Sequence, residues 1–128
     1  MYLKALEVNG FKSFAEKVRI DFTKGITSVV GPNGSGKSNI LDSILWVLGE
    51  QSYKNIRAKE SQDVIFSGEK NKKEKTFAEV SLIIDNSDFT LQHEATEIKV
   101  TRYINRKSDN FYFINDQKVR LKDIQELF

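Results

Sequence analysis

The pattern of apolar and polar positions predicts a chain rich in β-strands. Apolar residues alternate with polar ones over five segments, which are residues 3–9, 17–22, 77–84, 98–104 and 111–114. A period of two is typical of strands that bury one face. The turn-prone Ser108-Asp109-Asn110 predicts a hairpin between the last two segments. We therefore expect the second half of the chain to be mainly antiparallel.

A different pattern fills the region between these strands. Residues 26–30 are almost continuously apolar and β-branched, which favours a strand buried on both faces. From Lys37 to Leu48 apolar residues recur on one helical face, and Gly49 is placed to end that helix. The apolar positions of this face are Ile40, Leu41, Ile44, Leu45 and Leu48. Trp46 is interpreted as core, and residues 50–62 are expected to form an exposed loop.

The rest of the chain carries weaker signals. Residues 63–66 form a short apolar anchor, and residues 68–76 are a possible flexible insert. Apolar residues at helical spacing over 121–128 predict a final helix that looks truncated. With 128 residues, the chain has the size of one domain, or of part of one.

Composition excludes several classes of protein. The chain has no cysteine and one histidine, so disulfides and thiolate or imidazole metal clusters are not expected. It has no apolar run of membrane-spanning length and no secretion signal at its start, so we expect no membrane association and a cytoplasmic location. A net charge of +2 does not by itself indicate nucleic-acid binding. His93 is interpreted as solvated, and no two of the acids are spaced for acid–base catalysis.

The strongest motif is a phosphate-binding loop, Gly31-Pro32-Asn33-Gly34-Ser35-Gly36-Lys37-Ser38. It follows the predicted buried strand and opens the predicted helix, as this motif requires. The glycines let successive backbone N–H groups converge on phosphate oxygens, Lys37 neutralises the β- and γ-phosphates, and the Ser38 hydroxyl is expected to bind Mg²⁺. The sequence therefore predicts a nucleotide and Mg²⁺ as ligands. The expected nucleotide-contacting residues are Pro32, Asn33, Gly34, Ser35, Gly36, Lys37, Ser38 and Asn39.

Kinases, GTPases and ATP-driven DNA machines share this loop, and its position helps to separate them. Simple kinases and GTPases usually reach the loop from their first strand. Here two strands precede it, and antiparallel strands follow the helix. This order resembles the head of an ATP-binding-cassette ATPase. The fold class is then α/β: the first part of such a head, with a mixed or antiparallel sheet, one phosphate-loop helix and a truncated final helix.

Longer blocks of sequence resemble the bacterial SMC (structural maintenance of chromosomes) family from end to end. They are Gly10-Phe11-Lys12-Ser13-Phe14, the phosphate loop with Asn39-Ile40, Trp46-Val47-Leu48-Gly49-Glu50-Gln51-Ser52, Asp63-Val64-Ile65-Phe66-Ser67-Gly68, Ala78-Glu79-Val80 and Arg120-Leu121-Lys122-Asp123-Ile124. The Rad50 and RecF repair ATPases share the loop, but the Phe-Lys-Ser-Phe and Gly-Glu-Gln-Ser blocks are not expected in them. A nucleotide-gated DNA-binding module of that kind is the alternative interpretation.

The resemblance implies a function for the complete protein. In this family both ends of a long coiled-coil polypeptide build one ATPase head. A homodimer with a kleisin and accessory subunits holds or moves double-stranded DNA during chromosome condensation and segregation. The chain has no strand ending in Asp-Glu and no Leu-Ser-Gly-Gly signature. We therefore expect it to bind phosphate but to need the carboxy-terminal half of the head for hydrolysis.

The resemblance also assigns roles to individual side chains. Arg57 corresponds to a family arginine that reaches the bound nucleotide, so Lys37 and Arg57 are the expected catalytic residues. Lys59, Arg120 and Lys122 are candidates for sequence-independent contact with the DNA backbone. The segment around Lys59 departs from the glycine-rich family version, which weakens that assignment.

Overall fold

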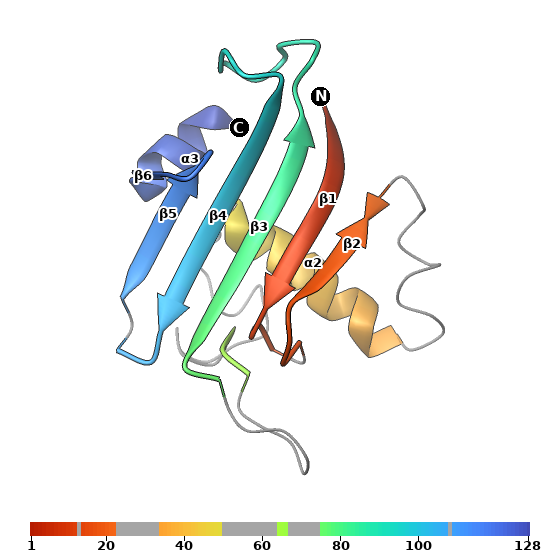
Figure 1. Ribbon diagram of the computed structural model, residues 1–128, viewed down its shortest axis with the longest axis vertical. Coiled ribbons are helices and arrows are strands. Elements are labelled where there is room, and N and C mark those ends of the chain that lie inside the picture. Colours follow the sequence, from red (N-terminus) through yellow and green to blue (C-terminus); the bar gives the residue numbers. More distant parts are fainter. Residues whose placement is uncertain (13, 23–33, 50–63, 67–74, 108) are drawn as a thin grey trace.

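The computed structural model describes residues 1–12, 14–22, 34–49, 64–66, 75–107 and 109–128, with the backbone only for residues 34–38. Its core is a six-stranded antiparallel sheet in the order β2-β1-β3-β4-β5-β6 (Figure 1). The strands are β1 (Tyr2–Asn9), β2 (Val18–Asp21), β3 (Phe77–Asp85), β4 (Glu97–Asn105), β5 (Asn110–Ile114) and β6 (Gln117–Val119). The helices are α2 (Gly34–Val47) and α3 (Leu121–Leu127).

The alternating segments of the sequence form the strands that they predict. In β3, Ala78, Val80, Leu82 and Ile84 are fully buried and belong to the hydrophobic core. Glu79, between Ala78 and Val80, is only partly buried, because neighbouring side chains point to opposite faces of a strand. The register places Leu6 opposite both Ile20 and Leu82, so the apolar positions of neighbouring strands share one face.

Helix α2 lies across that apolar face, behind the strands in Figure 1. Ile40, Trp46 and Val47 are fully buried. Trp46 is therefore a core residue, as predicted. Of the predicted apolar positions, however, Leu41 and Leu45 are 59% and 43% exposed and do not pack on the sheet. The apolar surface of α2 is wider than one face, and its periodicity cannot show which part of that surface meets the sheet.

The carboxy-terminal region adds an element that the pattern did not predict. Strand β6 pairs with β5 through a turn in which Asn115 and Asp116 have φ of 49° and 67°. Positive φ at both central residues is the geometry of a tight hairpin, and an Asn-Asp pair favours it. The turn signal was present, but a strand of three residues is too short to show alternation.

Helix α3 confirms the predicted final helix and packs against the end of α2. Ile124 is fully buried. A Cβ built on Gly49 would lie 3.1 Å from Leu121 Cδ1 and 3.3 Å from Gln125 Cγ. Gly49 has φ of 104°, so a glycine here both ends α2 and allows α3 to approach closely. The predicted strand at 26–30 and loop at 50–62 lie outside the described residues.

Candidate nucleotide site

The phosphate-loop motif coincides with the start of α2. The helix begins at Gly34, so residues 34–38 of the motif form its first turn and Asn39 follows directly. Backbone N–H groups in the first turn of a helix have no partner within the helix, and they carry its partial positive charge. Such a helix end fits an anionic phosphate group. Residues 31–33 of the motif, including Pro32 and Asn33, lie outside the described part of the chain.

A buried ion pair fixes α2 to the loop that follows β1. Lys12 Nζ lies 2.8 Å from Asp42 Oδ2, and the two side chains are only 12% and 8% exposed. Asp42 lies four residues after Ser38, so it occupies the same side of the helix about one turn further on, a rise of roughly 6 Å. The pair therefore joins the middle of α2, about one turn after the phosphate loop, to the Gly10-Phe11-Lys12 segment.

The backbone of that segment is strongly constrained. Gly10 has φ of 69°, and a Cβ built on it would lie 2.3 Å from the carbonyl oxygen of Phe77. Only glycine fits here, because any side chain would collide with β3. Lys12 also has a positive φ of 50°, which is uncommon for a residue with a side chain. The resulting turn directs Phe11 into the core, where its ring centroid lies 5.2 Å from that of Trp46.

Arg102 holds the other end of α2. Its Nη1 donates to the backbone carbonyl of Trp46 at 2.8 Å, and its Cζ lies 4.6 Å from the centre of the Trp46 ring. The same Cζ lies 5.2 Å from the centre of the Tyr112 ring. A cation at the carboxyl end of a helix complements the partial negative charge there. Sequence reasoning missed Arg102 because alternation alone places it on the buried face of β4 without showing what it contacts.

Residues 64–66 contact the same Gly10-Phe11-Lys12 segment. Phe66 donates its N–H to the carbonyl of Gly10 at 2.6 Å, and Lys12 donates its N–H to the carbonyl of Val64 at 2.6 Å. All three residues of the segment are buried, which agrees with the predicted apolar anchor. Arg106 then donates to the carbonyls of Phe66 and Lys75, at 3.0 and 3.1 Å. These two carbonyls flank residues 67–74.

Of the other predicted site residues, Arg57 and Lys59 lie outside the described ranges. Arg120 and Lys122 lie at the start of α3, with their side chains 77% and 68% exposed. Each has an acidic neighbour: Arg120 Nη2 is 3.4 Å from Asp123 Oδ1, and Lys122 Nζ is 3.7 Å from Glu126 Oε1. The backbone N–H of Arg120 also donates to Asp123, and this hydrogen bond, with that of the guanidinium, lowers the pKa of the Asp123 carboxyl.

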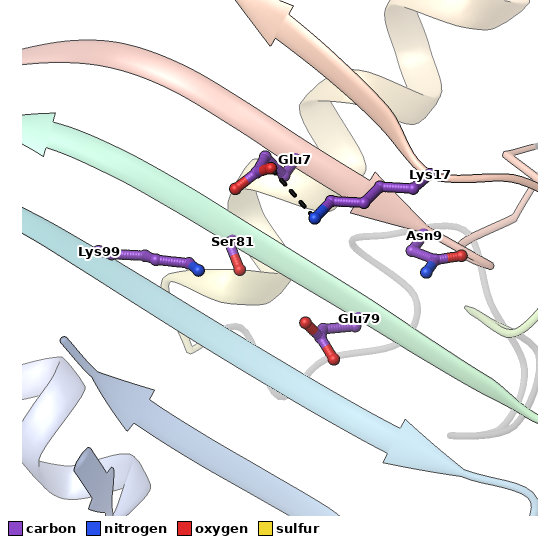
Figure 2. A pocket seen from close by; sticks show the side chains of 6 residues that line it. All are labelled: Glu7, Asn9, Lys17, Glu79, Ser81 and Lys99. Atoms are coloured by element: carbon purple, nitrogen blue, oxygen red, sulfur yellow. Dashed lines mark ion pairs between the residues drawn. The ribbon is translucent and has the colours of Figure 1, made fainter. Parts of the chain in front are cut away.

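The opposite face of the sheet carries a small charged pocket of about 60 Å³ (Figure 2). Its lining residues are Glu7, Asn9, Lys17, Glu79, Ser81 and Lys99. Lys17 Nζ lies 3.3 Å from Glu7 Oε2. This pairing of β1 with the segment before β2 is a tertiary contact that spacing could not predict. The volume suits one or a few water molecules rather than a nucleotide.

Two further observations limit the chemistry of the described residues. They contain no group of three or more histidine, aspartate or glutamate side chains that could hold a metal ion. None of their helices is long and apolar enough to cross a membrane.

His93 was predicted to be solvated, but it is partly buried and its Nδ1 accepts the N–H of Ala95 at 3.0 Å. This hydrogen bond helps to hold the connection between β3 and β4.

Comparison with known proteins defines the class to which this arrangement belongs. Residues 2–128 match the family described as the RecF/RecN/SMC N-terminal domain, and the chain is a member of that family. Within it, the chain is 70% identical over all its 128 residues to the chromosome partition protein Smc of Fusobacterium nucleatum. It spans 11% of the length of that relative. The resemblance to SMC proteins predicted from the sequence is thereby confirmed.

Solved structures agree with this assignment. A structure from work on ATP-driven dimerization and DNA-stimulated activation of SMC ATPases superimposes with a TM-score of 0.90 and 38% identity, covering 99% of this chain and 77% of that one. An Smc head domain from Pyrococcus furiosus, bound to the C-terminal domain of ScpA, gives 0.88 and 36%, covering 98% and 32%. RecF, at 20% identity and 0.66, shares the fold. The fold is therefore that of the first part of an SMC ATPase head.

Proposed function

We propose that this chain is the ATP- and Mg²⁺-binding part of an SMC head. The observation that carries the proposal is the coincidence of the phosphate-loop sequence with the first turn of α2, a helix of 14 residues held by the sheet. Backbone N–H groups of residues 34–38 would bind phosphate oxygens, and Lys37 would neutralise the β- and γ-phosphates. Ser38 would hold Mg²⁺, which supplies further positive charge at the phosphates when bound.

Pro32, Asn33 and Asn39 would complete the nucleotide contacts around this loop. Asn39 is the first residue of α2 whose side chain the structure describes, and it is partly buried at the start of the helix. Arg57 would stabilise charge on the transferred phosphoryl group. Hydrolysis itself would need the carboxy-terminal half of the head, because these 128 residues contain neither an Asp-Glu strand nor a Leu-Ser-Gly-Gly signature.

The exposed side of α2 supports the need for that second half. Leu41 and Leu45 lie one turn apart and form an apolar ridge on the outside of the helix. The core of the described residues does not cover it. We propose that the carboxy-terminal half of the same head packs on this ridge. Because the ridge lies on the helix that begins with the phosphate loop, a domain packed on it would hold the missing catalytic elements close to the nucleotide.

In the complete protein, binding and hydrolysis of ATP would drive engagement of two heads in a homodimer. Together with a kleisin and accessory subunits, this cycle would hold or move double-stranded DNA during chromosome condensation and segregation. The protein would act in the cytoplasm, associated with the nucleoid. The basis is the identity to chromosome partition proteins along the whole chain. A repair ATPase of the Rad50 or RecF type is the weaker alternative, since the RecF match is limited to a shared fold.

Titration of the full-length protein with ATP, with and without Mg²⁺, tests the proposal. Replacing Lys37 with alanine should abolish or strongly weaken ATP binding, because it removes a cation from the phosphate site. Ser38→Ala should mainly reduce the Mg²⁺ dependence of binding. A third variant, Lys4→Ala, removes an exposed lysine of β1 and should leave the ATP affinity unchanged. Unchanged affinity in Lys37→Ala would show that this loop does not bind nucleotide.

A further inference from the structure

We propose that the outer face of the sheet, the face opposite α2, binds single-stranded nucleic acid. Bases would stack on Phe77, Tyr103 and Phe111, and Lys75 and Lys118 would bind the phosphates. None of these residues belongs to the phosphate-loop motif or to the double-stranded DNA contact expected at the start of α3. The proposal goes beyond the ATP-dependent function and does not depend on it.

The three rings form a row across three neighbouring strands. Phe77 is on β3, Tyr103 on β4 and Phe111 on β5. The centroid of the Tyr103 ring lies 5.5 Å from that of Phe77 and 5.9 Å from that of Phe111, and the ring planes are inclined by 22° and 37°. A row of neighbouring rings offers successive bases a stacking surface, and such stacking tolerates any sequence because every base has a π-face.

The row is accessible because strand alternation directs it away from the core. Arg102 and Ile104, on either side of Tyr103, are buried, whereas Tyr103, Phe77 and Phe111 are only partly buried. Both described helices pack against the other face of the sheet (Figure 1). A sheet face with two or three aromatic rings that no helix covers is suited to holding unpaired bases.

Two lysines lie at the ends of the row. Lys75 Nζ is 5.7 Å from the centre of the Phe77 ring, and Lys118 Nζ is 4.6 Å from the centre of the Phe111 ring. Within the described ranges neither ammonium is paired with a carboxylate. Cation–π contacts of surface lysines are weak, so these groups can turn to the phosphates of a strand that lies across the rings. The row is therefore flanked by the positive charge that a phosphodiester backbone requires.

An acid on the same face allows a test by the sign of its charge. Glu79 lies directly opposite Tyr103 in the register, so the two side chains share the outer face. Figure 2 shows Glu79 and Lys99 on this face. A hollow of about 230 Å³ beside the row is lined by Glu79, Lys99, Thr101, Phe113 and Asp116. The Glu79 carboxylate would repel a phosphate bound there, so removing its charge should strengthen binding.

Photo-crosslinking of the full-length protein tests the proposal at the site itself. The probe is a short oligothymidylate in which one base is replaced by 5-iodouracil. Near-ultraviolet light couples this base to an aromatic side chain that it contacts, and mass spectrometry of the peptides locates the new bond. We expect crosslinks at Phe77, Tyr103 or Phe111, and none when the same strand is part of a duplex. A uridylate probe of the same length shows whether RNA binds there as well as DNA.

The yield of the crosslinked peptide at increasing probe concentration gives the dissociation constant of this surface alone. Tyr103→Leu, monitored by the crosslink at Phe77 or Phe111, should weaken binding about tenfold, since one stacking ring is lost. Lys75→Gln with Lys118→Gln keeps all three rings and should lower the salt dependence by about 1.4 units of slope. Glu79→Gln should strengthen binding by about threefold.

The matched control is Phe89→Leu, which alters an aromatic residue that is 56% exposed in the connection between β3 and β4 and should leave the crosslinking unchanged. Crosslinks confined to other parts of the protein, or equal crosslinking of single strand and duplex, would overturn the proposal. A wild-type dissociation constant in Tyr103→Leu, with folding verified by thermal unfolding, would overturn it too. The rings would then serve as cross-strand packing or as a protein-binding surface. If Tyr103→Leu does not fold, an unchanged salt slope in the lysine variant has the same consequence.

Discussion

The guanidinium of Arg102 donates a hydrogen bond to the backbone carbonyl of Trp46, 56 residues earlier in the chain, and lies over the indole ring of the same residue. Arg102 is only 2% exposed, and Trp46 is fully buried. The contact ties the carboxyl end of α2 to the centre of the sheet. A charged residue on the buried face of β4 is thus part of the core and fixes the helix that carries the phosphate loop.

Replacing Arg102 with methionine should destabilise the protein by about 2–4 kcal/mol, because the carbonyl of Trp46 loses a charged donor and two rings lose a cation. Chemical denaturation measures this change. Arg19→Met, which alters an arginine with 54% exposure on β2, should change stability by less than about 0.5 kcal/mol. Equal stability of the Arg102 variant and the wild type would mean that the buried guanidinium makes no net contribution to the free energy of unfolding.

A side chain at Gly10 should be poorly tolerated. Gly10→Ala would bring a Cβ to 2.3 Å from the Phe77 carbonyl, at a φ of 69°. We expect a loss of about 2 kcal/mol or more, measured by thermal unfolding. Phe89→Gly is the matched comparison, because Phe89 also has a positive φ, 53°, but is 56% exposed. That change should leave stability unchanged or raise it slightly, since glycine adopts such a conformation at no steric cost.

Acid should weaken the contact between the amino terminus and the β3–β4 connection. The hydrogen bond from the N-terminal ammonium, with that from Thr90, lowers the pKa of Asp88 from 3.8 to about 2. Because the pKa is lower in the folded state, the contact stabilises the protein above about pH 4 and this contribution is lost as pH falls to about 2.

The comparison that tests this is Asp88→Asn, which should be less stable than the wild type near neutral pH and should approach it as pH falls through that window. Unfolding by urea at a series of pH values gives the difference in free energy. Acetylation of the α-amino group removes the partner charge and should reproduce the same pattern. A difference that stays constant from pH 5 to about pH 2 would contradict this explanation of the pKa.

The ridge of α2 should mediate binding of the carboxy-terminal half of the head. Leu41→Glu and Leu45→Glu place charge on exposed positions, so the fold should persist while affinity for the co-expressed half falls by about tenfold or more. Co-purification and titration of the two halves measure this loss. Leu3→Glu, at a leucine with 36% exposure on β1, is the control. Unchanged affinity in the ridge variants would place the contact elsewhere.

Contact with DNA should depend on the start of α3. Neutralising Arg120 and Lys122 together, by Arg120→Gln and Lys122→Gln, should weaken binding of the full-length protein to any duplex and lower the salt dependence by about two units of slope. Their ion pairs with Asp123 and Glu126 are exposed and weak, so they can exchange for phosphates.

Fluorescence anisotropy with two unrelated duplexes across a salt series, using ATP-engaged heads, measures this effect, and ATP affinity should be preserved. Lys17→Gln with Arg19→Gln is the matched control, because these two cations are also exposed and also pair with an acid, Glu7. Equal slopes for the Arg120/Lys122 variant and the wild type would assign DNA contact to another part of the protein.

The sequence by itself determined the first five described strands, the two described helices and the motif. Successive side chains of a strand point to opposite faces of the sheet. The alternation of apolar residues such as Leu6 and Val80 with polar neighbours was therefore enough to predict β1 to β5. The phosphate loop was equally clear, because its glycines, Lys37 and Ser38 stand at fixed spacing before a helix. The family resemblance depended on whole blocks of sequence and was confirmed by the comparisons.

Only the tertiary structure decided which side chains meet across the chain. Lys12 and Asp42 are 30 residues apart, and Arg102 and Trp46 are 56 apart. No local pattern pairs them, because their proximity depends on the order of the strands and on the angle at which α2 crosses the sheet. For the same reason periodicity did not separate the buried Ile40 from the exposed Leu41. Local sequence fixes which face of a strand is apolar, whereas packing fixes what that face contacts.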